Sequence, residues 1–357
     1  MTISSSTTSV VDRYLSCLKR LAMVLLVLGG LAGCQQSTEL ELYEFSGSTM
    51  GTTYSIKVAE LPPNLLPDVV AERIQSELEA VNQAMSTYRN DSELSLFNQL
   101  PADSSMVFST DTFIVLQKSL EIWRRSQGAF DVTVGPLVNL WGFGPEGRPN
   151  RVPDVDAQRA AWKRVGSDAL VLDPDKHSVR KLRDVYVDLS AIAKGYGVDK
   201  VAAALESLGV RRYMVEVGGE IRVGAGKSPT QPWRLAVEKP VPQLREIQRV
   251  IDAENLAVAT SGDYRNYFED QGVRYSHTID PRTGKPIQHK LVSATVIAPE
   301  CADADGWATA MMVLGPEQGI AVANAQHLAV YMLVMTDEGL QAKHSKAFAA
   351  YMQERKH

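Results

Sequence analysis

The sequence predicts an α+β fold, on three observations. Segments with alternating apolar residues, typical of strands, follow segments with three-to-four spacing, typical of helices, in an irregular order. Late in the chain, short strands separated by turns indicate antiparallel hairpins. No Gly-x-Gly-x-x-Gly follows a predicted strand and no Walker-type lysine loop occurs, which argues against a Rossmann or P-loop fold.

Residues 1–33 predict an export signal that lies outside the fold. A basic stretch ending at Arg20 precedes an apolar run over residues 21–31, and Cys34 follows two small residues. This pattern resembles the lipobox of bacterial lipoproteins. The resemblance implies cleavage before Cys34, lipid on that cysteine and a tether over residues 34–42, on the periplasmic side of a bacterial membrane. The sequence does not choose between inner and outer membrane, and an uncleaved anchor is the alternative.

Composition narrows the class of protein. Residues 43–357 are long enough to bury a full core. The formal net charge of −5 argues against a nucleic-acid partner. Of the three cysteines, Cys17 leaves with the signal and Cys34 would carry lipid, so Cys301 has no disulfide partner in the mature chain. There is no Cys/His zinc pattern.

The helices and strands are predicted in chain order from periodicity and punctuation. Apolar residues at helical spacing predict a helix over 68–85, and a polar loop over 86–94 follows it. A second helix is predicted to begin at its cap, Ser109, and to end at Gly128. Further helices are predicted over 154–165, 194–209 and 303–314, with another opening at Pro316. Strands are predicted over 53–58, 169–180 (a hairpin), 185–187, 212–223, 233–238, 256–264, 275–280, 291–297 and 329–335.

The segment 185–197 combines an acid, a lysine and the start of a helix. Asp188 ends a short apolar strand, small residues follow, and Lys194 precedes Gly195 at the helix start. Helix N-termini present free N–H groups, and a lysine adds a positive charge. The set suits a phosphate-bearing ligand with a metal, and an ordinary strand, turn and helix with a solvated lysine is the alternative.

Three other places could carry chemistry. Asp305 and Thr309 share a helix face and could supply two oxygens to Mg²⁺, or simply belong to a capped helix start. The stretch Gly218-Gly219-Glu220 could form an anion nest or a bulge. His277, on a predicted strand, could accept a proton or be a satisfied, half-buried histidine.

Eight stretches occur in an order that resembles one known family, the ApbE-type FAD:protein FMN transferases. They are MGT at 50–52, STY at 86–88, GAFDVT at 128–133, DLSAIAKGYG at 188–197, VGGE at 217–220, ATSGDY at 259–264, HTIDP at 277–281 and DGWATA at 305–310. The resemblance covers nearly everything after the tether.

The resemblance implies a reaction in which FAD is split at its pyrophosphate. FMN is placed through a phosphoester on a threonine or serine of another protein, and AMP leaves. The implied acceptors are subunits of sodium-pumping NADH:quinone reductase or of Rnf-type complexes. The implied fold is an α+β body with two sheets and flanking helices, of the tunnelling-fold type.

The resemblance also assigns site residues. The implied FAD contacts are Met50, Tyr88, Ala129, Phe130, Asp131, Asp188, Lys194 and Ile279. The implied Mg²⁺ ligands are the backbone oxygen of Ala191 and the side chains of Asp305 and Thr309. The acceptor hydroxyl must lose a proton, and His277 is our candidate base, with Asp188 or water as alternatives.

Two other functions use the same residues. A Mg²⁺-dependent FAD pyrophosphatase would release FMN and AMP, with water as the acceptor. A flavin-binding lipoprotein would not react at all, although Lys194, Asp305 and Thr309 argue against it. A solute-binding lipoprotein would need a regular two-lobe βα pattern, which the sequence lacks.

Overall fold

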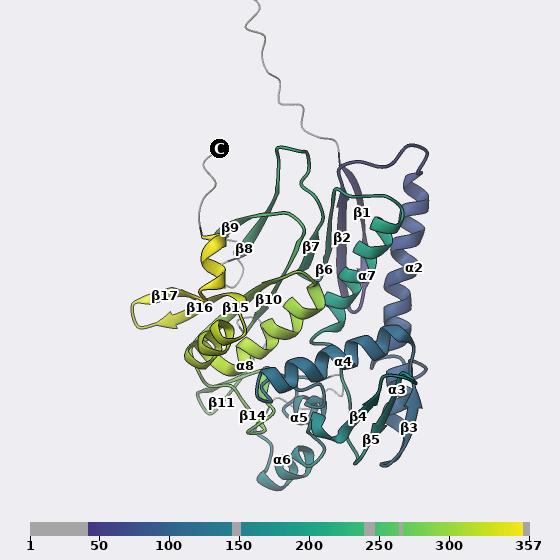
Figure 1. The fold of residues 1–357 in the computed structure, drawn as a ribbon. Coiled ribbons are helices and arrows are strands. Elements are labelled where there is room, and N and C mark those ends of the chain that lie inside the picture. Colours follow the sequence, from purple (N-terminus) through teal and green to yellow (C-terminus); the bar gives the residue numbers. More distant parts are fainter. Residues whose placement is uncertain (1–41, 145–150, 239–246, 264–266, 353–357) are drawn as a thin grey trace, which may run out of the picture. The chain divides into compact units, whose positions relative to one another are not determined.

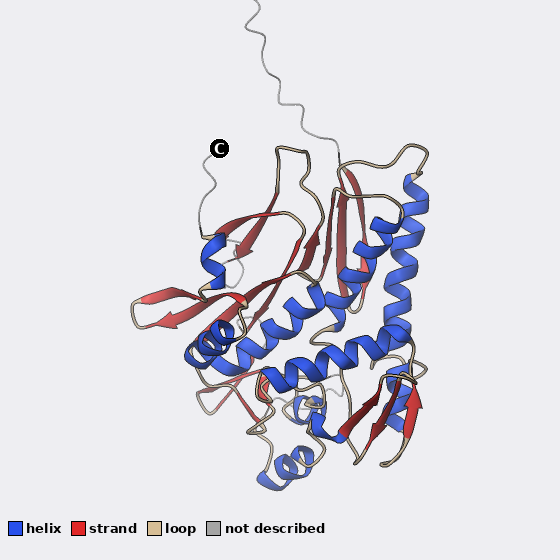
Figure 2. Ribbon diagram, in the orientation of Figure 1, coloured by secondary structure: helices blue, strands red, loops and turns tan. Residues whose placement is uncertain are grey.

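The computed structural model describes residues 42–144, 151–238, 247–263 and 267–352, and it confirms the α+β class. An eight-stranded antiparallel sheet, with the order β1-β2-β6-β7-β10-β15-β16-β17, is covered by helices (Figures 1 and 2). Its strands are β1 Tyr43–Thr49, β2 Thr52–Val58, β6 Tyr213–Val217, β7 Glu220–Val223, β10 Leu256–Gly262, β15 Leu291–Ala298, β16 Ala329–Thr336 and β17 Gly339–His344. The predicted export signal and Cys34 lie outside the described residues.

The other described strands form small sheets, so one large sheet dominates where the resemblance implied two. A three-stranded sheet has the order β3-β5-β4, and β8–β9, β11–β12 and β13–β14 are two-stranded. Their bounds are β3 Ser105–Val107, β4 Leu170–Asp173, β5 Ser178–Lys181, β8 Trp233–Glu238, β9 Ile247–Ala253, β11 Tyr267–Asp270, β12 Val273–Ser276, β13 Ile279–Asp280 and β14 Lys285–Pro286.

The helices include each one that the periodicity predicts. Their bounds are α2 Pro67–Met85, α3 Glu93–Gln99, α4 Thr110–Arg125, α5 Gly135–Leu140, α6 Val155–Trp162, α7 Ala193–Ser207 and α8 Cys301–Ala325, with short 3₁₀ turns η1 Ser167–Ala169 and η2 Ala347–Tyr351. The predicted break before Pro316 is confirmed inside α8, because Gly315 has a φ of 76° and a ψ of 179°. In the described part of the chain, no helix combines the length and apolarity needed to cross a membrane.

The main sheet is buried on both faces, as strand β16 shows. Val330, Met332 and Val334 belong to the core beneath the helices, whereas Tyr331 and Leu333 belong to the core beneath β8, β9 and η2. Because successive side chains of a strand point to opposite faces, a strand covered on both sides reads as a nearly continuous apolar run. The run AVYMLVM at 329–335 has this composition.

The structure corrects the local predictions in two kinds of place. Helix α3 begins at the end of the polar loop predicted over 86–94, and α5 lies in a stretch for which no helix was predicted; each is too short for a clear period. The strand predicted over residues 185–187 is absent, because these residues pair with no neighbouring strand among the described residues. Instead the Asn98 side chain pairs with Val187, its Nδ2 donating to the Val187 carbonyl at 2.8 Å and its Oδ1 accepting from the Val187 N–H at 2.8 Å. The strand expected over 275–280 is divided into β12 and β13 by a bend at His277.

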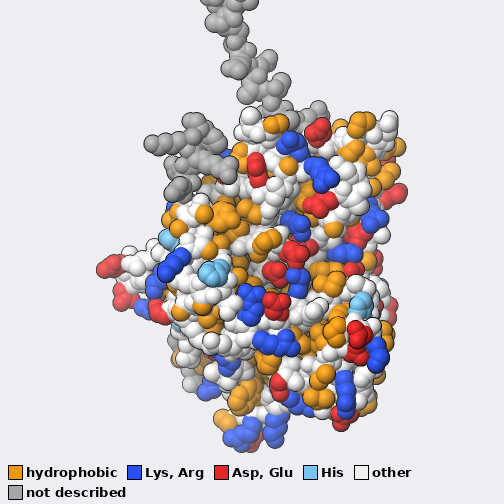
Figure 3. All heavy atoms as spheres, in the orientation of Figure 1, with side chains coloured by type: hydrophobic (Ala, Val, Ile, Leu, Met, Phe, Trp, Pro, Cys, Tyr) orange, Lys and Arg blue, Asp and Glu red, His pale blue; other side chains and the backbone are white. Residues whose placement is uncertain are grey.

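Helices α2, α4, α7 and α8 lie together on one side of the main sheet (Figure 1). On the corresponding surface, acidic and basic side chains are interspersed and neither sign gathers into one large patch (Figure 3). The polar residues considered next lie where α7 meets α8.

Candidate functional site at the contact of helices α7 and α8

The contact between α7 and α8 depends on a glycine. A Cβ placed on Gly195 would lie 2.4 Å from the carbonyl oxygen of Cys301 and 2.8 Å from Cβ of Asp305. Without a side chain, the Gly195 N–H donates to Oδ2 of Asp305 at 3.0 Å. The start of α7 is therefore held directly against the first turns of α8.

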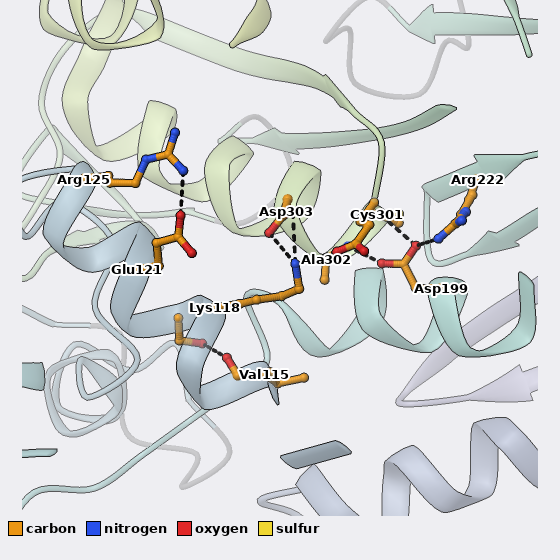
Figure 4. A network of polar contacts seen from close by, with 11 residues as sticks. Val115, Lys118, Glu121, Arg125, Asp199, Arg222, Cys301, Ala302 and Asp303 are labelled. Carbon is orange, nitrogen blue, oxygen red and sulfur yellow. Dashed lines mark hydrogen bonds and ion pairs between the residues drawn. The ribbon is translucent and has the colours of Figure 1, made fainter. Parts of the chain in front are cut away.

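The start of α8 is also fixed by side chains from α4 and α7 (Figure 4). Asp199 of α7 accepts from the backbone N–H groups of Cys301 and Ala302, each at 2.9 Å, and from Nη1 of Arg222 at 2.7 Å. A carboxylate at a helix N-terminus satisfies free N–H groups and interacts favourably with the helix dipole. Lys118 of α4 lies 3.0 Å from Asp303. These contacts set the position from which Asp305 faces α7.

Three ionisable side chains, Lys194, Glu220 and Asp305, form a cluster at this contact, in which the two acids are buried and the Lys194 side chain is 28% exposed. Nζ of Lys194 lies 3.1 Å from Oε1 of Glu220 and 3.5 Å from Oδ2 of Asp305. Glu220, the first residue of β7, is 4% exposed, and Asp305 is also buried. Among the described residues, Oε2 of Glu220 is buried with no hydrogen-bond partner. Two acids thus share one lysine, and the cluster can accept further positive charge.

The environment shifts the pKa of each group. Burial raises the pKa of Glu220 to about 8, with help from Asp305 and opposition from Lys194. Burial also raises the pKa of Asp305, against the ammonium of Lys194 and the Gly195 N–H. For Lys194, burial is outweighed by the charges of Asp305 and Glu220, so its pKa is raised. The lysine is therefore a permanent cation, while the two acids gain from any cation that approaches them.

The residues predicted to bind Mg²⁺ fit a small divalent cation. Thr309 lies one helical turn after Asp305, with Oγ1 3.3 Å from Oγ of Ser261 on β10. Ala191 lies in the turn just before α7, four residues before the glycine that contacts Asp305. Carboxylate, hydroxyl and carbonyl oxygens suit Mg²⁺, and the contacts of Asp305 with Gly195 and Lys194 are both made by Oδ2. No group of three His, Cys, Asp or Glu side chains suited to a metal occurs among the described residues.

Two of the predicted flavin contacts could adjust to a ligand: Met50 has a flexible side chain, and Tyr88 is exposed. Met50 lies in the two-residue turn between β1 and β2 with a φ of 49°. Its methyl carbon lies 2.7 Å from the Cβ position of Gly197, so its side chain packs on α7. Tyr88, in the loop after α2, is 76% exposed. Such an exposed ring is available to stack on a flat ligand.

The other predicted FAD contacts are turned mainly into the protein. Ala129, Phe130 and Ile279 are buried. Oδ1 of Asp131 accepts from the N–H and hydroxyl of Thr133 at 2.8 and 2.6 Å and from the hydroxyl of Ser167 at 2.7 Å. The Asp131 side chain therefore joins two loops, and its contact with FAD stays a prediction.

Asp188 and His277, the two candidate bases, differ in their surroundings. Oδ1 of Asp188 accepts from the N–H of Ser190 at 2.9 Å and from its hydroxyl at 2.5 Å. The His277 side chain is 34% exposed, and its Nδ1 lies 3.5 Å from Oδ1 of Asp263. Ser261 contacts Thr309, and Asp263 follows Ser261 by two residues. The Cα atoms of Ser261 and Asp263 are therefore at most about 7 Å apart. This link associates His277 with the predicted metal ligands.

The sequence prediction omitted Glu220 from the site. The stretch Gly218-Gly219-Glu220 was noted as a nest or a bulge, and the structure shows a turn in which both glycines have positive φ, 60° and 99°. An acid directly after such a turn was the available signal. Its role depends on Lys194, a partner that lies on another element.

The fold and the cluster define an α+β protein with a buried polar site between two helices, suited to an anionic ligand with a cation. Comparison with known proteins identifies the family. The ApbE family model matches residues 50–332, and the chain belongs to the ApbE family.

Several relatives and solved structures are similar over nearly the whole described chain. The FAD:protein FMN transferase of Vibrio cholerae is 47% identical over 322 residues, covering 90% of this chain and 96% of the relative. That of Haemophilus influenzae is 46% identical, covering 89% and 93%. The flavin transferase ApbE structure from Vibrio cholerae has a TM-score of 0.81 at 46% identity, covering 87% of this chain and 99% of that one. The apo flavinyl transferase ApbE of Pseudomonas stutzeri has a TM-score of 0.81 at 39% identity, covering 87% and 96%.

Proposed function

We propose that this chain is a Mg²⁺-dependent transferase that moves FMN from FAD to a threonine or serine of another protein. The observation that carries the proposal is the cluster of Lys194 with the buried acids Glu220 and Asp305, with Thr309 one turn away. Membership of the ApbE family and the names of its relatives support FAD as the substrate.

The proposed reaction is a substitution at the FMN phosphorus of FAD. The acceptor hydroxyl oxygen forms a bond to this phosphorus, and the bond between the phosphorus and the bridging oxygen breaks. AMP leaves with the bridging oxygen and the bonding electron pair. The hydroxyl proton passes to a base, so the products are the FMN phosphoester and AMP.

His277 is the proposed base, because it is partly exposed and lies beside Asp263. A carboxylate near Nδ1 favours the tautomer that keeps the proton on that nitrogen, which leaves Nε2 to accept the hydroxyl proton. Asp188 is the weaker candidate, since its Oδ1 already accepts two hydrogen bonds from Ser190.

Charge at the pyrophosphate is the second requirement. A divalent cation held by Asp305, Thr309 and the Ala191 carbonyl would neutralise negative charge on the pyrophosphate oxygens and on departing AMP. Lys194 supplies a fixed positive charge at the same helix start. Tyr88 and Met50 would hold the flavin ring, the first by the exposed face of its ring and the second by a flexible thioether.

We also propose a place of action. Residues 1–33 would direct export, and lipid on Cys34 would hold residues 43–357 at the periplasmic side of a membrane. The acceptors would be membrane-complex subunits with a domain on that side, such as those of sodium-pumping NADH:quinone reductase or Rnf-type complexes.

The proposal is tested by incubating the protein with FAD, Mg²⁺ and a candidate acceptor, and measuring flavin fluorescence of the acceptor on a denaturing gel. Asp305→Asn is expected to slow labelling on the order of 100-fold or more, because it removes the charge that binds the cation. Asp337→Asn makes the same change at an exposed aspartate in the turn between β16 and β17, which pairs with Lys290, so it is the matched control and should label at nearly the normal rate.

Two outcomes would contradict the proposal. Rapid labelling by the Asp305→Asn variant would exclude this carboxylate as the cation ligand. Release of free FMN and AMP without labelled acceptor would favour the pyrophosphatase instead, and chromatography of the nucleotides detects it.

A further inference from the structure

Glu220 occupies a position that packing alone does not explain. It begins β7, is 4% exposed, and directs Oε1 to Lys194 at 3.1 Å. Oε2 is buried and has no hydrogen-bond partner within the described residues. A buried carboxylate is costly unless it is paired and hydrogen-bonded. An apolar side chain or a glutamine would fill the same space at lower cost, so packing alone does not account for a glutamate at this position.

The turn that carries Glu220 also guides the stem of Lys194. A Cβ on Gly218 would lie 3.3 Å from Cδ of Lys194 and 2.9 Å from Cγ2 of Thr52. The absence of a side chain at this position leaves a passage for the lysine stem. The turn between β6 and β7 therefore holds Lys194 at its stem through Gly218 and at its ammonium through Glu220.

The alternative partner of Lys194 is Asp305. The ammonium lies 3.5 Å from Oδ2 of Asp305, farther than from Glu220, and the same oxygen accepts from the Gly195 N–H. If Glu220 were neutral, the ammonium would have Asp305 as its only charged partner in the cluster. Lysine and a metal ion would then compete for one carboxylate.

We propose that Glu220 is the counter-ion of Lys194, which it holds so that the charge of Asp305 stays available to a divalent cation. Glu220 is thus a positioning residue that acts through Lys194 and does not contact the cation itself. When both acids are ionised, two carboxylates and one ammonium leave one negative charge in the cluster, and this surplus is what a cation at Asp305 and Thr309 complements. The inference rests on the proposed function, because the cation site is part of it.

The test is a calorimetric titration of the full-length protein with Mg²⁺, without FAD, at pH 8.5, where more of Glu220 is ionised than at pH 7. Glu220→Gln keeps the shape and an oxygen for Lys194 but removes the charge. We expect the dissociation constant of this variant for Mg²⁺ to be about tenfold higher than that of the wild type. This is the lower end of the effect seen when a residue that holds a metal ligand in place is lost. Melting of each variant, followed by circular dichroism, shows that it is folded.

The matched control is Glu206→Gln at the other end of α7, twelve residues and about 18 Å from Lys194. Oε1 of Glu206 accepts a hydrogen bond from the Tyr213 hydroxyl at 2.5 Å. This variant makes the same chemical change on the same helix and should bind Mg²⁺ like the wild type.

The double variant Lys194→Met with Glu220→Gln separates the counter-ion role from the others. It has the same net charge in the cluster as the wild type, and it has no lysine to compete for Asp305. We expect its affinity for Mg²⁺ to return to within about threefold of the wild-type value. An affinity as low as that of Glu220→Gln would overturn the inference, because a direct ligand or a packing role for Glu220 gives that result.

The remaining outcomes are also distinct. Unchanged affinity in Glu220→Gln, with normal binding by the wild type, overturns the counter-ion role and leaves the proposed function intact. Lack of Mg²⁺ binding by the folded wild type removes the cation site from the proposed function, and this inference with it.

Discussion

Gly195 and Gly197 offer a direct test of the contact between α7 and α8. Both glycines are buried near the start of α7, and a Cβ on either would be too close to a neighbour. The neighbours differ in kind. For Gly195→Ala they are the Cys301 carbonyl oxygen at 2.4 Å and carbon at 2.7 Å, whereas for Gly197→Ala the nearest atom is the end of the Met50 side chain at 2.7 Å.

The expected magnitudes follow from this difference. Replacing glycine by alanine in a helix stabilises it by up to about 1 kcal/mol in either variant. Overpacking against backbone costs roughly 1–3 kcal/mol, because the two helices must separate. The Met50 side chain can rotate away at little cost. The free energy of unfolding of Gly195→Ala should thus lie about 1–3 kcal/mol below that of Gly197→Ala.

Thermal unfolding followed by calorimetry measures the difference. At roughly 2–4 °C for each kcal/mol, a value for somewhat smaller domains, Gly195→Ala should melt several degrees below Gly197→Ala. Gly195→Ala should also slow flavin transfer more than Gly197→Ala does, because the N–H of residue 195 donates a hydrogen bond to Asp305. Gly197→Ala should mainly alter the KM for FAD, through the displaced Met50 side chain. Equal melting temperatures, or a higher one for Gly195→Ala, would refute the close backbone contact.

Three other predictions concern neighbouring features. Asn98→Ala should lower the free energy of unfolding by about 1–3 kcal/mol in urea denaturation, because both the N–H and the carbonyl of Val187 lose their partner; an unchanged midpoint would contradict it. His277→Ala should lower kcat by roughly 10²–10⁴-fold, and a normal kcat would exclude it as the base. The unfolding free energy of the metal-free protein should fall by a few kcal/mol at most as the pH rises from about 5 to 8. The reason is that the folded state keeps a proton on Glu220 up to a pKa of about 8, whereas the unfolded chain loses it near 4.5. Chemical denaturation at several pH values should show a smaller slope for Glu220→Gln, and an equal slope would contradict the assignment.

The sequence was sufficient for elements whose pattern is long or clearly punctuated. Helix α2 shows its period over 19 residues, and the buried positions Val70, Ile74 and Leu78 are those that the period selects. The helix break at Gly315 was predictable because Pro316 fits only the first turn of a helix. These elements follow from local rules that the tertiary structure does not override.

The missed elements depend on partners that no local pattern contains. Helix α3 has seven residues, too few to distinguish a helical period from a polar loop. The apolar residues 185–187 have strand composition, yet the partner of Val187 is the side chain of Asn98, 89 residues earlier. A single side-chain amide can satisfy one N–H and one carbonyl, as a neighbouring strand would.

In the candidate site, the sequence likewise predicted residues that take part but not how they pair in space. Asp305 and Thr309 were paired from their spacing, because four residues make one helix face. Lys194 was noted for its place at a helix start, and the structure turns it toward two acids. The pairing of Gly195 with Asp305 spans 110 residues and depends on a missing side chain. The cluster therefore follows from how closely two helices approach, which is why Glu220 gains its role only when the whole fold is known.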